Sequence, residues 1–240
     1  MEVPRTILDE WQITAEELSR AINENPSLRG MVFGYVAEVK LKELIKSFPE
    51  VTYFTKFDDH NRKKKGDLYV IYKRRAFDIE SKSLQTGKQG WNEEVRKFVG
   101  DAQVDGSDKR AVPFEDGTSL LTTNLLKGQF DILAVNCYAF EKTWRWVYAR
   151  NSDLETSRFR GYTLAQRAKL LATLQRVTWP PMPPYTDDLR ALLDDMVARG
   201  EGSAPEEVLA GGQIVTEVDE GQGASTLPAL GTLLDEDQEV

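Results

Sequence analysis

The chain has 240 residues, of which 40% are hydrophobic, and its formal net charge is −8. It contains no run of about 18 apolar residues, the minimum for a membrane span, and no basic start followed by an apolar signal segment. We therefore expect a cytoplasmic protein with no membrane partner. Cys137 is the only cysteine, which excludes an intrachain disulfide, and its apolar surroundings predict a buried, inert thiol. His60, the only histidine, lies in a polar loop and is not expected to be catalytic.

The acidic charge is concentrated at the end of the chain. Residues 201–240 contain ten of the 39 acidic residues and no Lys or Arg, which leaves 29 acidic against 31 basic residues before them. We therefore predict one folded domain over residues 1–184, with its core at about 31–149, and a C-terminal helix over 185–199. Residues 200–240 are expected to form an acidic tail that is disordered or docked on the domain.

The first third of the chain predicts two helices followed by a strand. Thr14 begins a capping-box pattern and predicts a short helix that ends near Asn25. After a break at 26–30, apolar residues at helical spacing predict a longer helix over 31–48, with Glu38 at the edge of its apolar stripe. The β-rich residues 51–57 then predict the first strand of a sheet.

The stretch GDLYVIYKRRAFDIESKS, residues 66–83, predicts two strands joined at Lys73-Arg74-Arg75. Because side chains alternate between the two faces of a strand, Glu80 and Lys82 should share one face. If the strand that begins at Asp67 pairs alongside, its carboxylate approaches that of Glu80. Two carboxylates, together with carbonyl and water oxygens, are ligands suited to Mg²⁺.

The later part of the chain predicts further elements of both kinds. Residues 91–102 carry apolar side chains at helical spacing and predict a second core helix, and residues 105–128 predict a long loop. The apolar run 130–140 predicts a central strand paired with 143–149, where Trp144, Trp146 and Tyr148 should pack in the core. Residues 163–176 predict a helix capped by Thr163.

These residues and their order resemble the PD-(D/E)xK nuclease superfamily. The resemblance rests on Gly66-Asp67 followed by Glu80-Ser81-Lys82 on an apolar strand. The pattern departs from the family at Gly66, where the family often has Pro. The resemblance implies an α/β fold with a restriction endonuclease-like core, in which a mixed sheet is flanked by helices in the order helix-strand-strand-strand-helix-strand.

The resemblance also implies an activity and a set of site residues. It predicts a metal-dependent DNA endonuclease, such as a restriction or phage-defence enzyme, which uses Mg²⁺ or Mn²⁺ and leaves 5′-phosphate ends. Asp67, Glu80 and Lys82 would be catalytic, with Asp67 and Glu80 as metal ligands. In the family, an acid on the first core helix often completes the metal site, and Glu38 is the candidate by position. A homodimer would be consistent with cutting both strands of double-stranded DNA.

Two basic segments are candidates for binding DNA phosphates. One precedes Asp67 and the other lies in the predicted long loop; together they comprise Arg62, Lys63, Lys64, Lys65, Lys109 and Arg110. Basic turns also keep a protein soluble, so charge alone does not decide between these interpretations.

Other interpretations of the same residues remain open. A second Glu-x-Lys, at Glu38 and Lys40, lies in a helical pattern and shows that the motif can arise by chance. Glu80 and Lys82 would then be an ordinary ion pair on a strand face, and Glu38 would pair with Lys42. At the level of function, the alternatives are a noncatalytic DNA- or protein-binding module with the same fold, and a regulatory subunit of a larger nuclease complex.

Overall fold

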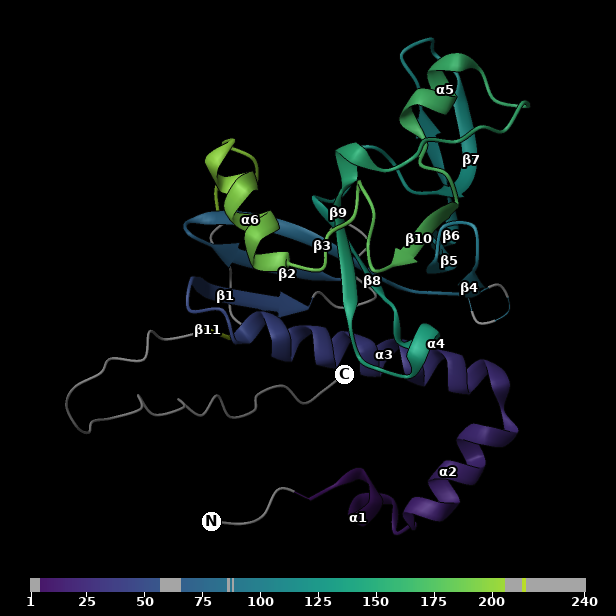
Figure 1. The fold of residues 1–240 in the computed structure, drawn as a ribbon, viewed down its shortest axis with the longest axis vertical. Helices are drawn as coiled ribbons and strands as arrows, with labels where there is room; N and C mark the ends of the chain where they lie inside the picture. The colour runs from purple at the N-terminus through teal and green to yellow at the C-terminus, as the bar shows by residue number, and fades with distance from the viewer. Residues whose placement is uncertain (1–4, 57–65, 86, 88, 206–212, 215–240) are drawn as a thin grey trace, which may run out of the picture.

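A mixed sheet forms the centre of the fold (Figure 1). The computed structural model describes residues 5–56, 66–85, 87, 89–205 and 213–214. Within these residues the sheet has six strands in the order β11-β1-β2-β3-β8-β9, and only β3 and β8 pair in parallel. The strands are β1 (Val51–Lys56), β2 (Leu68–Tyr72), β3 (Arg75–Ser83), β8 (Ile132–Asn136), β9 (Trp146–Arg150) and β11 (Gln213–Ile214).

The hairpin of β2 and β3 forms as the sequence predicts. Lys73 and Arg74 make a two-residue turn in which both have positive φ, 46° and 64°, and such turns match the twist of the strands they join. The register places Leu68 opposite Ile79. Asp67, one residue before β2, therefore lies across from Glu80.

Helices α3 (Pro26–Lys46) and α6 (Leu189–Ala198) bury their apolar side chains against the sheet. Leu41 of α3 and Leu193 of α6 belong to the same hydrophobic cluster as Phe77 and Ile79 of β3, and all four are fully buried. The predicted α/β class, with a mixed central sheet flanked by helices, is confirmed. The aromatic side chains of 144–148 pack in this cluster, as predicted.

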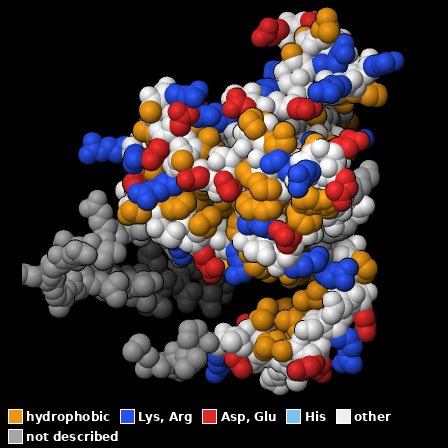
Figure 2. All heavy atoms as spheres, in the orientation of Figure 1, with side chains coloured by type: hydrophobic (Ala, Val, Ile, Leu, Met, Phe, Trp, Pro, Cys, Tyr) orange, Lys and Arg blue, Asp and Glu red, His pale blue; other side chains and the backbone are white. Residues whose placement is uncertain are grey.

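The N-terminal helices follow their capping signals. α1 (Ile7–Trp11) and α2 (Ala15–Glu24) each begin with a capping box, and that of Thr14 confirms the predicted start of α2. The predicted break at 26–30 is wrong, because Pro26 occupies the first turn of α3, where the proline ring is tolerated. No described residue of α1 or α2 is buried, and hydrophobic side chains gather on this exposed pair (Figures 1 and 2).

The helix predicted over residues 91–102 is wrong. The structure instead has β4 (Gly90–Asn92), a turn, and β5 (Lys97–Gln103), with Trp91 paired to Phe98. Aromatic and β-branched side chains favour strands, and β5 also pairs with the distant strand β10 (Leu174–Trp179). This long-range pairing outweighs the local helical spacing. The connection from β3 to the parallel strand β8 therefore contains strands where the expected core order has a helix.

The long loop predicted over 105–128 is also wrong. It contains the hairpin of β6 (Asp105–Pro113) and β7 (Ser119–Asn124), which turns through Gly117 at a φ of +79°. This hairpin and the short helix α5 (Leu164–Lys169) lie together at one end of the molecule (Figure 1).

The helix predicted over 163–176 is much shorter than expected. Thr163 caps α5 as predicted, but the helix ends at Lys169 and residues from Leu174 onward belong to β10. Leu171, within the predicted helix, is buried and forms an isolated bridge with Thr156, whereas Leu164 is exposed. Tertiary pairing again decides the conformation.

The described C-terminal segment docks on the sheet. The predicted last helix is confirmed in a shorter form as α6, after which Arg75 donates hydrogen bonds to the carbonyls of Gly200, Glu201 and Gly202. Residues 206–212 and 215–240, which contain most of the predicted acidic tail, lie outside the described residues. None of the helices in the described ranges has the length and apolar character that crossing a membrane requires.

Candidate active site

Asp67 is held at the edge of the hairpin by two hydrogen bonds. Its backbone N–H donates to the Ile79 carbonyl at 2.9 Å, and its Oδ2 accepts from the Ser81 N–H at 2.7 Å. The preceding Gly66 has a φ of +73°, and a Cβ at this position would lie 3.1 Å from the Ile79 oxygen. Proline, which is restricted to negative φ, cannot adopt this conformation. Proline could therefore not replace Gly66 in this conformation.

Glu80 and Lys82 share one face of β3, as the alternation of the strand predicts. Lys82 Nζ lies 2.8 Å from Glu80 Oε1, and the Glu80 side chain is only 10% exposed. Their face is opposite to Phe77 and Ile79, which pack with α3 and α6. The structure therefore brings Asp67, Glu80 and Lys82 together at one end of the β2–β3 pair.

The site has more negative than positive charge near Glu80. Burial, and then the neighbouring Asp67 carboxylate, raise the pKa of Glu80 even though Lys82 opposes the shift. Burial by itself would lower the pKa of Lys82, but the Glu80 and Asp67 carboxylates outweigh burial and raise it. Both shifts favour an additional positive charge at the carboxylates. A divalent cation would supply such a charge.

The donor set fits Mg²⁺ or Mn²⁺ in part. Asp67 and Glu80 provide two carboxylates from adjacent strands, and hard cations prefer such oxygen ligands together with carbonyl groups and water. In the part of the chain that the structure describes, no three Asp, Glu, His or Cys side chains form a group that could hold a metal. A metal held by Asp67 and Glu80 would thus take its remaining ligands from the backbone, water or substrate.

Glu38 lies on α3, and the structure does not join it to Asp67 and Glu80 in a metal-binding group. Its Oε2 accepts a hydrogen bond from Lys56 Nζ at 2.6 Å, and its side chain is 16% exposed. The partner at this distance is on β1, and the Glu38 carboxylate also opposes the lowering of the Lys42 pKa by burial, so Lys42 lies nearby as well. Glu38 is nevertheless close enough to contribute to the raised pKa of Glu80.

The structure describes two of the predicted phosphate-binding residues, Lys109 and Arg110. Arg62, Lys63, Lys64 and Lys65, like His60, lie outside the described residues. Lys109 is exposed on β6, whereas Arg110 is half-buried and donates a hydrogen bond to the Asn124 carbonyl at 2.9 Å. Burial lowers the pKa of Arg110, and the Glu80 carboxylate opposes that shift, so Arg110 lies within electrostatic range of the site.

Sequence reasoning missed Asp105, the first residue of β6. Its carboxylate contributes to the raised pKa of Lys82, which places a further acid near the site. The sequence assigned Asp105 to a loop and gave no signal of this proximity. Cys137, by contrast, matches its prediction, because it is fully buried and burial raises the pKa of its thiol to about 12.

The protein thus has a mixed α/β fold, with an acidic site that contains a lysine at the end of a central hairpin. No protein-family model, curated protein or solved structure matches the chain.

Proposed function

We propose that this protein is a metal-dependent DNA endonuclease that hydrolyses phosphodiester bonds, with Asp67, Glu80 and Lys82 as its catalytic residues. The observation that carries the proposal is the buried Glu80 carboxylate, 2.8 Å from the Lys82 ammonium and beside Asp67. Burying charges in this way is costly for a protein, and such clusters occur preferentially at functional sites.

Each side chain has a role that follows from its surroundings. The Ser81 N–H fixes the Asp67 carboxylate, and the strand fixes Glu80, so the two acids are preorganised as ligands for one cation. Bound Mg²⁺ would polarise the phosphodiester and lower the pKa of the attacking water. Lys82 keeps its proton because its pKa is raised, so it donates hydrogen bonds to developing negative charge and does not serve as the general base.

The order of the elements supports a restriction endonuclease-like core. Helix α3 is followed by β1, β2 and β3, and β8 then pairs in parallel with β3. The departure is the β3–β8 connection, which holds β4 to β7. In such a core, β4 to β7 would be an insertion in this connection.

A noncatalytic DNA- or protein-binding module is the second candidate. The observation that favours it is the direct Glu80–Lys82 ion pair, which partly neutralises Glu80 without any metal. In such a module the carboxylates would have only a structural role. DNA would bind without being cut, and metal removal would change nothing.

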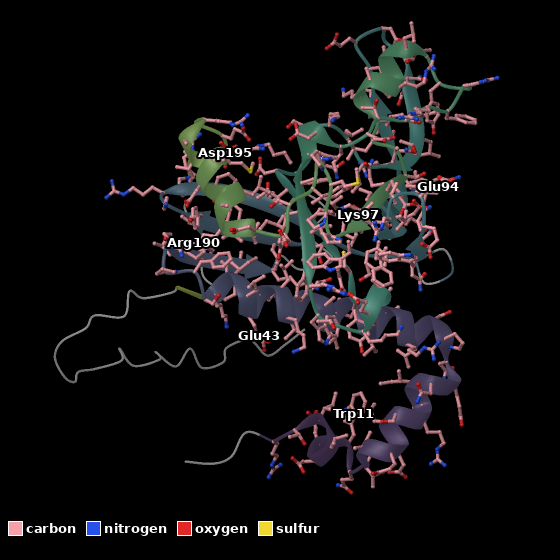
Figure 3. The ribbon with its side chains drawn as sticks, in the orientation of Figure 1. Trp11, Glu43, Glu94, Lys97, Arg190 and Asp195 are labelled. Carbon is pink, nitrogen blue, oxygen red and sulfur yellow. The ribbon has the colours of Figure 1, made fainter. Side chains whose placement is uncertain are left out.

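Incubation of the full-length protein with supercoiled, linear and single-stranded DNA separates these candidates. Wild type and Glu80→Ala would be compared with Mg²⁺, with Mn²⁺ and with EDTA. Glu43→Ala is the matched control, because Glu43 lies on the outer side of α3 with its side chain 66% exposed (Figure 3).

The endonuclease proposal predicts metal-dependent cutting by wild type and Glu43→Ala and none by Glu80→Ala. Cutting by Glu80→Ala at the wild-type rate would move the site elsewhere. Salt-sensitive DNA binding with no cutting by any form would favour the noncatalytic module.

A further inference from the structure

A cavity of about 700 Å³ opens at the carboxyl ends of the parallel strands β3 and β8. Its wall is formed by the first turns of α3, the residues that follow Lys82 on β3, and the helix α4 (Tyr138–Glu141) that follows β8. A volume of this size is typical of sites for small molecules. Ser83, which lines the cavity, is the last residue of β3 and directly follows Lys82, so the cavity lies at the same end of β3 as the site but on the face of the sheet that α3 covers.

The charge around the cavity favours an anion. Arg29 from α3 and Lys142 from the end of α4 line it, and among the lining residues that the structure describes there is no Asp or Glu. The first turn of α3 also contains no acidic side chain. The neighbouring catalytic site is acidic, so the two regions have opposite charge. A phosphate group would be attracted to Arg29 and Lys142.

The remaining lining residues favour a flat ring that can form hydrogen bonds. Phe33 and Tyr138 line the cavity with their ring centroids 5.4 Å apart, and Phe33 also stacks on Trp144. Gln89 Oε1 is buried without a hydrogen-bond partner among the described residues. An unpaired buried acceptor is unfavourable, and an amino or imino group of a ligand would satisfy it.

We propose that this cavity binds one unpaired deoxynucleotide of the substrate strand. Its phosphate would contact Arg29 and Lys142, and its base would lie against Phe33 and Tyr138, with Gln89 accepting a hydrogen bond from the base. This inference rests on the proposed endonuclease function for the identity of the strand. The cavity alone indicates the chemistry of its ligand, which is an anionic group joined to a flat ring that donates a hydrogen bond.

Calorimetric titration of the full-length protein in EDTA tests the inference without any cleavage reaction. The probes are deoxyadenosine 5′-monophosphate, deoxyadenosine and inorganic phosphate. The first variant is Arg29→Gln with Lys142→Asn, because asparagine tolerates the φ of +58° at position 142. The second is Gln89→Leu, and the control is Arg20→Ala on the exposed face of α2.

We expect wild type and Arg20→Ala to bind the monophosphate at least about tenfold more tightly than either fragment. The double variant should bind the monophosphate about tenfold or more weakly than wild type. Gln89→Leu should also weaken binding of the monophosphate, and it should change binding of inorganic phosphate less. Equal affinity of wild type and the double variant for the monophosphate would overturn the inference. Failure of wild type to bind the monophosphate at millimolar concentration would also overturn it. Circular dichroism of each variant would establish that it is folded.

The same titration with Glu80→Ala separates this inference from the proposed function. If wild type cuts DNA but no form binds the monophosphate, the cavity assignment fails and the endonuclease proposal stands. If Glu80→Ala and wild type both bind the monophosphate through Arg29 and Lys142 and neither cuts DNA, the cavity assignment stands and the endonuclease proposal fails.

Discussion

Lys82 Nζ lies 2.8 Å from Glu80 Oε1, two positions away on the same face of β3. The pair is not balanced, because Asp67 adds a second negative charge and both Glu80 and Lys82 have raised pKa values. Removing one partner of a buried pair is destabilising, because it leaves the other charge buried and uncompensated. The effect of Lys82 on stability and its proposed role in catalysis can therefore be measured separately.

Lys82→Gln should lower the free energy of unfolding by about 1–3 kcal/mol, because it leaves Glu80 buried without its partner. It should also slow DNA cleavage by about 100-fold or more, because it removes the charged donor. The double change Glu80→Gln with Lys82→Gln should recover part of the stability and none of the cleavage. Chemical denaturation and single-turnover rates measure the two effects. Recovery of cleavage in the double variant would contradict the assigned roles.

Leu41 anchors α3 to the sheet and has no exposed surface. Leu41→Ala should lower the free energy of unfolding by about 2–5 kcal/mol, because it removes buried contacts and leaves a cavity. Val39→Ala is the control on the same helix, since Val39 is 52% exposed, and it should change stability by no more than about 0.5 kcal/mol. Equal effects of the two variants in urea denaturation would show that α3 does not pack on the sheet in this way.

The site hairpin is the part of the fold that sequence predicts best. Its signals are local, because the two residues Lys73 and Arg74 join strands whose side chains alternate between faces. The predicted helix over 91–102 failed for the opposite reason. Its residues have helical spacing, but Val99 pairs with Thr178 far along the chain, and no local window contains that partner.

Local signals and long-range contacts also contribute differently to the prediction of the site. Asp67, Glu80 and Lys82 were predicted because they lie within one hairpin. Arg110 is predicted from its charge alone, as a candidate for binding phosphate, and Asp105 is not predicted. Both come near the site through the hairpin of β6 and β7, which the local pattern predicts to be a loop. Their proximity to Glu80 and Lys82 depends on tertiary structure, and the sequence carries no periodic signal of it.

Gly202 and Gly200 allow a matched test of how the C-terminal segment docks. Both have positive φ, +79° and +75°, but a Cβ at Gly202 would lie 2.9 Å from the Ala76 oxygen, whereas one at Gly200 would meet nothing within 4 Å. Gly200→Ala should cost about 1–2 kcal/mol from backbone strain alone. Gly202→Ala should cost more, because the segment must shift away from β3. Denaturation midpoints of the two variants give the comparison, and a smaller loss in Gly202→Ala would contradict this docking.

Asp194 links α6 to the β2–β3 turn through Lys73 Nζ at 2.6 Å and the Tyr72 hydroxyl at 2.7 Å. The hydrogen bond from Lys73, and then that from Tyr72, lower the pKa of Asp194. Because the pKa of Asp194 is lower in the folded than in the unfolded state, its ionised carboxylate stabilises the fold at pH values above the unfolded pKa. This contribution is lost as the pH falls through the folded pKa.

Asp194→Asn should therefore lower the free energy of unfolding at pH 7. The loss should stay below about 1 kcal/mol, because the carboxylate is 45% exposed and solvent screens the pair. The difference from wild type should shrink as the pH falls below the unfolded pKa of Asp194 and through its lower folded pKa. Glu94→Gln, on the exposed turn between β4 and β5 (Figure 3), is the control and should show no such pH dependence. A pH-independent loss in Asp194→Asn would exclude the ionic contribution.

The most direct test of the central claim is the single-turnover cleavage rate of wild type and Glu80→Gln on double-stranded DNA, each with Mg²⁺ and with EDTA. Glutamine keeps the size of the side chain but removes the charge that would hold the metal. We predict cleavage by wild type in Mg²⁺ alone, and a loss of at least about 100-fold in Glu80→Gln. Cleavage by wild type in EDTA, or an unchanged rate in Glu80→Gln, would contradict a metal-dependent site built on Asp67 and Glu80.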